Sequence, residues 1–98
     1  MIVRWLQEAE QDRVDIFSYI EAENPAAAAE LDEKFTRVAD RLVDFPYIGR
    51  PELIPGTREF IPHENYRLVY EVRENTVYIL AVVHTSRQWL PPAEEARH

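Results

Sequence analysis

The chain has 98 residues, which is enough for one small domain with a single core. Hydrophobic residues make up 46% of it and charged residues 30%, the composition of an ordinary folded domain. It contains no cysteine, which excludes disulfides, thiol nucleophiles and cysteine-ligated zinc. No stretch approaches the roughly 18 apolar residues of a membrane span, and the first residues lack a signal-peptide pattern, so we expect a soluble, cytoplasmic protein.

The charge balance narrows the choice of partners. The 11 basic and 18 acidic residues leave a net charge of −7, the wrong sign for a protein attracted to phosphate backbones. Nucleic acid is therefore disfavoured as the main partner. Acidic residues crowd positions 7–44 and arginines recur in the second half, so a local basic patch could still form on one face.

The first half of the chain predicts a short strand and a helical hairpin. Residues 1–5 are β-prone, and apolar residues then recur at helical spacing from Leu6 to Ile20, which predicts a helix ending near Glu23. Asn24 and Pro25 suit the N-cap and first turn of a second helix. Its apolar stripe indicates core packing and comprises Ala27, Leu31, Phe35, Val38, Leu42 and Phe45.

The second half predicts a sheet. Pro46 ends the second helix, and a proline- and glycine-rich loop leads to strands over 57–61, 66–73 and 76–84. The last strand is apolar on both faces and should be central. The order βααβββ predicts an α+β domain over residues 1–90, with an N-terminal helical hairpin packed on a small antiparallel sheet. Residues 91–98 form a polar, proline-containing tail, either frayed or a short helical turn.

Few residues have the spacing that chemistry requires. The three histidines lie in unrelated contexts, the two glycines are isolated, and Ser86 has no strand-turn-helix elbow. We therefore expect no metal, no cofactor and no nucleophilic catalysis.

One set of residues could act on RNA. Arg58, Arg67 and Arg87, with His63, His84 and Tyr66, could converge on the exposed side of the sheet if the first and third strands flank the second. Arginines that stabilise a pentacoordinate phosphate, with a base and an acid beside it, suit RNA cleavage by transphosphorylation. Strand alternation places His84 on the face of Tyr78, Leu80 and Val82, but it does not decide whether Arg67 shares that face.

Each of these residues also has a structural interpretation. Arg67 could pair with Glu59 or Glu71 across strands, and Arg58 with carboxylates of the acidic helices. His84 ends an apolar run, where a hydrogen-bonded cap is commoner than a catalyst. Trp89 could fold back over the core or, if exposed, anchor an interface.

The whole pattern resembles the RelE/ParE superfamily of bacterial toxins from type II toxin-antitoxin systems. The resemblance spans residues 1–89 and rests on five motifs in order, namely NPAAA, FPYIGRPE, GTREF, NYRLVYEV and VYILAVVHTSRQW. It implies one of two activities. RelE-like members cut mRNA in the ribosomal A site, and ParE-like members poison DNA gyrase.

The details favour the ParE-like, or plasmid stabilisation, branch. In the ribonuclease branch, strand arginines and lysines act with an aromatic or His-Tyr pair, and here only Arg67 and Arg58 match. Phe60 and Ile61 replace basic residues, and Trp89 cannot act as an acid or base. His84 and Arg87 resemble the HxxR ending of ParE-like members. An acidic chain would also be repelled by ribosomal RNA across a Debye length of about 8 Å.

The resemblance therefore implies a toxin that inhibits gyrase by binding it and that a cognate, ParD-like antitoxin neutralises. We expect partners to contact Leu31, Phe35 and Leu42, which the domain would leave partly uncovered, together with Arg67, Arg87 and Trp89. The alternatives are a RelE-like mRNA endoribonuclease, with Arg58, Arg67, His84 and Arg87 at the scissile phosphate, and a non-toxic relative of the same fold.

Overall fold

The computed structural model describes residues 1–91 of the chain, so the predicted tail falls almost wholly outside the described residues. The helices are α1 (Gln7–Glu21) and α2 (Pro25–Asp44). The strands are β1 (Ile2–Trp5), β2 (Arg50–Pro51), β3 (Arg58–His63), β4 (Tyr66–Arg73) and β5 (Thr76–His84). The predicted α+β fold with an N-terminal helical hairpin on a sheet is confirmed, and β2 is an additional two-residue strand within the predicted loop.

The second helix forms as its sequence predicts. The side chain of Asn24 accepts a hydrogen bond of 3.1 Å from the backbone N–H of Ala27, and Pro25 occupies the first helical position. Four of the six residues in the predicted stripe are buried, and the two ends of the stripe are not. Phe45 lies beyond the helix end and is 59% exposed.

The sheet has the strand order β1-β5-β4-β3-β2, so β5 lies inside the sheet as predicted. The neighbouring pairs β2–β3, β3–β4 and β4–β5 are antiparallel. β1 pairs with β5 in parallel, so the sheet is mixed and not wholly antiparallel as predicted. The alternation of apolar residues predicts which faces a strand buries, and it carries no information on the direction of a distant partner. β1 covers β5 only as far as the pair Trp5 and Ile79.

A β-bulge interrupts the pairing of β4 with β5. Val69 pairs with Ala81 but the next residue, Tyr70, pairs with Ile79, which leaves Leu80 as an extra residue. Val77, Ile79 and Val82 consequently pack on the helices, whereas Leu80 and Ala81 pack together on the opposite face. The expectation that His84 shares a face with Tyr78 and Leu80 is therefore wrong, because the bulge reverses the alternation before Val82.

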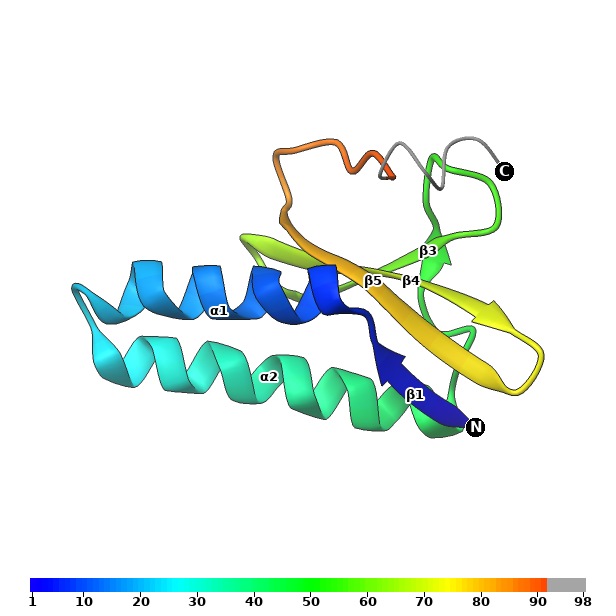
Figure 1. Ribbon diagram of the computed structural model, residues 1–98, viewed down its shortest axis with the longest axis horizontal. Coiled ribbons are helices and arrows are strands. Elements are labelled where there is room, and N and C mark those ends of the chain that lie inside the picture. The colour runs from blue at the N-terminus through cyan, green and yellow to red at the C-terminus, as the bar shows by residue number, and fades with distance from the viewer. Residues whose placement is uncertain (92–98) are drawn as a thin grey trace.

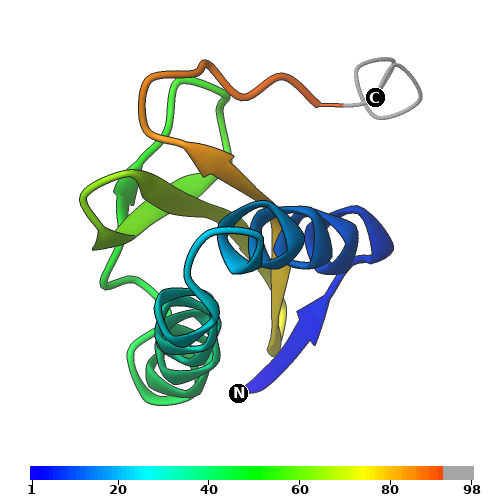
Figure 2. The same cartoon turned by 90° about the vertical axis from the view of Figure 1, so that its left-hand side faces the viewer.

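The two faces of the sheet have separate cores. Leu31, Phe35 and Leu42 of α2 meet Leu68, Tyr70 and Ile79 on the helical face. On the opposite face, which we call the outer face, Trp89 packs with Val69, Leu80 and Ala81. Figures 1 and 2 show the antiparallel helical hairpin, and both views place the segment after β5 beside the loop before β3, away from α2. Neither helix has the length and apolar content needed to span a membrane, as judged over residues 1–91.

Candidate functional site

Arg67 lies in a buried cluster of charges on the outer face. Its guanidinium pairs with the carboxylates of Glu52 and Glu59, and the side chains of all three are at most 10% exposed. The same guanidinium donates a 2.7 Å hydrogen bond to the backbone carbonyl of Arg87. The predicted pairing with Glu59 is confirmed, and Arg67 joins the loop before β3 to the segment after β5.

Glu59 links this cluster to the edge of the sheet. It accepts a 2.5 Å hydrogen bond from Nε of Arg50, which lies opposite it in the edge strand β2. Burial alone would raise the pKa of Glu59, but hydrogen bonds and ion pairs, above all with Arg67, outweigh it and hold the pKa below the ordinary value. The negative charge of Glu59 is therefore retained, and it holds the positive charge of Arg67 inside the protein.

Trp89 covers the outer face rather than projecting from it. Its side chain is 7% exposed and packs on Val69, Leu80 and Ala81. The alternative in which Trp89 folds back over the core is therefore confirmed, and the expectation of an exposed anchor is wrong. The apolar surface that β4 and β5 present on this face needs a cover, and the indole supplies it.

His84 and Tyr66 lie on the helical face, at the end of β5 and the start of β4. They are paired across the strands, with ring centroids 5.5 Å apart, and the ring of His63 lies 6.1 Å from that of Tyr66. Nδ1 of His84 accepts the backbone N–H of Ser86 at 3.1 Å and lies 2.7 Å from its hydroxyl. The three rings of the predicted set thus lie together, but on the helical face and not on the exposed side of the sheet as predicted. The role of His84 as a hydrogen-bonded end of the strand is confirmed.

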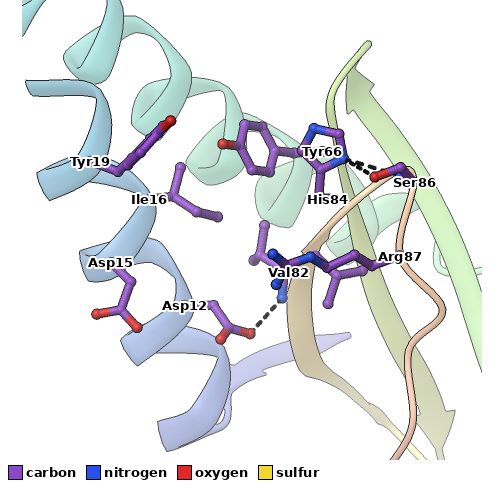
Figure 3. A pocket seen from close by; sticks show the side chains of 10 residues that line it. Asp12, Asp15, Ile16, Tyr19, Tyr66, Val82, His84, Ser86 and Arg87 are labelled. Atoms are coloured by element: carbon purple, nitrogen blue, oxygen red, sulfur yellow. Dashed lines mark hydrogen bonds between the residues drawn. The ribbon is translucent and has the colours of Figure 1, made fainter. Parts of the chain in front are cut away.

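A groove separates these rings from α1. It has a volume of about 620 Å³, and its walls include Asp12, Asp15 and Tyr19 of α1 and, opposite, Tyr66, His84 and Arg87. Figure 3 shows the side chain of Arg87 extending over Val82 toward Asp12. Asp12 accepts a 2.9 Å hydrogen bond from the backbone N–H of Val82, beyond the point where β1 stops covering β5.

Arg58 occupies a third location, at the start of β3. Its guanidinium donates a 2.8 Å hydrogen bond to the carbonyl of Gly49 and lies 5.0 Å from the ring centroid of Tyr47. The expected pairing with carboxylates of the helices is wrong, because the loop after α2 supplies its partners. Arg58 fixes that loop.

The four residues expected at a scissile phosphate do not converge. Only His84 and Arg87 line the same groove, whereas Arg67 is buried on the outer face and Arg58 binds the loop. The bulge explains the separation, because a regular β5 would have carried His84 onto the face of Arg67. Within residues 1–91, no three His, Asp or Glu side chains are placed to hold a metal ion.

The residues expected to contact partners differ in their exposure. Leu31, Phe35 and Leu42 are at most 5% exposed, so the domain covers them fully by itself. Arg67 is 8% exposed and neutralised. Of the six expected contacts, Arg87 alone is exposed within the described part of the chain. Asp12 and Glu52 carry no signal in the spacing of the sequence, because their partners lie 70 and 15 residues away along the chain.

The fold is a small α+β domain with a helical hairpin packed on a mixed sheet, and a solved structure shares this architecture. The chromosomal ParDE TA system from P. aeruginosa matches with a TM-score of 0.76 over 86% of this chain and 95% of that chain, at 20% sequence identity. At this identity the match establishes the fold.

Sequence comparison identifies the family. The profile of the family described as "ParE toxin of type II toxin-antitoxin system, parDE" matches residues 3–89. A protein named "Putative toxin Y4kP" from Sinorhizobium fredii (strain NBRC 101917 / NGR234) is 34% identical over 88 residues, which cover 89% of this chain and 91% of that protein. The chain therefore belongs to the ParE toxin family of type II toxin-antitoxin systems.

Proposed function

We propose that this ParE-family toxin acts by binding DNA gyrase, and that a cognate antitoxin neutralises it. The observation that carries the proposal is the burial of Arg67 between Glu52 and Glu59. A phosphate-cleaving centre needs cations that face the substrate, and here the central arginine of β4 is already neutralised by two carboxylates. This arrangement favours a toxin that acts by binding a protein target over one that cleaves a phosphate bond.

Arg87 is the proposed contact residue of this surface. It is exposed, it follows the end of β5, and its backbone is held in place by the hydrogen bond from Arg67. An arginine whose backbone is held in place at the rim of a groove is a suitable interface anchor, because less backbone entropy is lost on binding. We expect Arg87→Ala to weaken gyrase inhibition by about tenfold.

The second candidate function is ribosome-dependent mRNA cleavage. It is favoured by the clustering of His63, Tyr66 and His84 beside the groove that Arg87 also lines. The opposite wall of that groove carries Asp12 and Asp15, which would repel a phosphate. We therefore place this function second.

Two assays on the purified toxin separate the candidates. One is gyrase supercoiling and DNA cleavage, and the other is mRNA cleavage in a translating extract. Gyrase inhibition should be reduced by Arg87→Ala and should persist in His84→Ala, because the ring of His84 binds Ser86 at the strand end. Cleavage of mRNA that His84→Ala abolishes would establish the second candidate instead. Growth that is unaffected by expression without the antitoxin would indicate a non-toxic relative.

A further inference from the structure

α1 is less well covered by the domain than α2. Of its 15 residues only Ala9 is fully buried, whereas α2 buries six residues. Tyr19, which lines the groove, is 79% exposed, and Val14, on another side of α1, is 56% exposed. Apolar and aromatic side chains that remain exposed along one helix are a feature of protein interfaces.

The groove beside α1 adjoins a second hollow, on the other side of the hydrogen bond between Asp12 and Val82. The larger hollow contains Asp12, Asp15 and Tyr19, and the smaller one, of about 230 Å³, contains Glu8, Asp12 and Leu90. Both hollows share Asp12 and Val83. Together the two hollows extend along α1 for about three turns, with Tyr19 at one end and Leu90, which is 67% exposed, at the other.

The α1 wall of this groove is acidic, and Arg87 is the arginine that faces it from the opposite wall. Glu8, Asp12 and Asp15 lie on one side of α1, and none forms an ion pair with another residue of 1–91. The contacts of Asp12 and Asp15 are uncharged, namely the N–H of Val82 and the amide of Gln11. Burial raises the pKa of Asp12, and repulsion from Asp15 and Glu8 raises it further.

The helical hairpin as a whole carries the net charge of the protein. Residues 7–44 contain 11 acidic and 4 basic residues, a balance of −7, and the rest of the chain contains 7 of each, a balance of zero. A partner that covers α1 therefore meets a predominantly negative surface, because Arg13 of α1 is paired with Asp32 and Arg87 lies on the opposite wall of the groove. A basic partner segment gains from this field, whereas an acidic segment or a nucleic acid is repelled.

We propose that the antitoxin covers α1 with a basic segment, whose Lys or Arg side chains pair with Glu8, Asp12 and Asp15 while its apolar residues pack on Tyr19 and Leu90. This inference rests on the proposed function in one respect, namely that an antitoxin exists. It further specifies the antitoxin segment that occupies the groove, which must be cationic and amphipathic.

The test compares two toxin variants of equal charge. Glu8→Gln/Asp15→Asn removes two carboxylates from the groove, and the matched control, Glu30→Gln/Asp40→Asn, removes two exposed carboxylates from α2. The probe is the full-length product of the gene adjacent to the toxin gene, co-expressed and purified with it. Affinity is measured by calorimetry at about 50 mM and about 500 mM salt, where screening differs strongly.

The groove variant should bind the antitoxin about tenfold more weakly at low salt, and its affinity should depend less on salt than that of the wild type. The control variant should change affinity by less than about twofold. Equal losses in both variants, or an affinity independent of salt, would overturn the inference. Loss of gyrase inhibition with unchanged antitoxin affinity would also overturn it, because the occupant would then be gyrase.

The proposed function is tested separately, in the gyrase reaction with the toxin alone. A toxin that inhibits gyrase and binds its antitoxin without using the groove acids contradicts only the inference about the groove. A toxin whose antitoxin binding follows the groove acids but which leaves gyrase unaffected contradicts only the proposed target.

Discussion

Replacing Arg67 should destabilise the domain severely, whatever its target. Arg67→Met keeps most of the side-chain volume but leaves Glu52 and Glu59 buried without their shared cation. Removing one partner of a buried ion pair costs about 3–5 kcal/mol. Because 1 kcal/mol shifts the melting temperature of a domain this small by about 4–8 °C, the variant should melt at least about 12 °C below the wild type.

The assay is urea unfolding at neutral pH, followed by far-UV circular dichroism. A double-mutant cycle of Arg67→Met with Glu59→Gln should give a coupling energy of about 1–3 kcal/mol, because the second change removes one uncompensated carboxylate. The control is Arg37→Ala, which breaks an exposed pair with Glu33 and should cost about 0.5 kcal/mol. A loss below about 1 kcal/mol for Arg67→Met, or no coupling, would refute the structural role of Arg67.

Three further measurements probe other contacts. Gly49→Ala should cost about 1–3 kcal/mol in urea unfolding, because its Cβ would lie 2.5 Å from the carbonyl oxygen of Glu59 and 2.6 Å from the hydroxyl of Tyr70. Asp12→Ala should cost about 1 kcal/mol, because it leaves the N–H of Val82 unpaired. Asp12→Asn should cost less, since it keeps an acceptor for that N–H and removes the repulsion from Asp15 and Glu8. Equal costs for the two variants would contradict this role of Asp12. The pKa of Glu59 is lowered from 4.5 in the folded protein, so the ionised carboxylate stabilises the fold above pH 4.5. This stabilisation is lost as the pH falls through the pKa of Glu59 in the folded protein. Urea unfolding from pH 7 to pH 3 should show this loss, and Glu59→Gln should remove that part of the profile.

The local patterns of the sequence predict most of the fold, since they are set by residues close together in the chain. The second helix combines an N-cap, a first-turn proline and a stripe at spacings of three and four, and each acts within one or two turns. The bulge at Leu80 has no such signal, because the strand is apolar on both faces and either alternation buries apolar residues. A single inserted residue therefore decided which face His84 occupies.

The candidate site was less predictable because its contacts join distant parts of the chain. The partner of Arg67 in β3 was foreseen, since neighbouring strands bring Glu59 beside it, but Glu52 comes from an irregular loop. Asp12 can bind the backbone of β5 because β1 is too short to pair with the whole of β5. The periodicity of the sequence does not predict how much of one strand another strand covers. For Trp89 and Leu42 the sequence allowed both a core and a contact role, and the structure places both side chains in the core.

The most direct test of the account is DNA cleavage by gyrase in the presence of the purified toxin, with and without the co-purified antitoxin. We predict that cleaved DNA accumulates with the toxin, that Arg87→Ala weakens the effect and that the antitoxin abolishes it. Gyrase that continues to supercoil DNA normally, while the same preparation cuts mRNA in a translating extract, would contradict it.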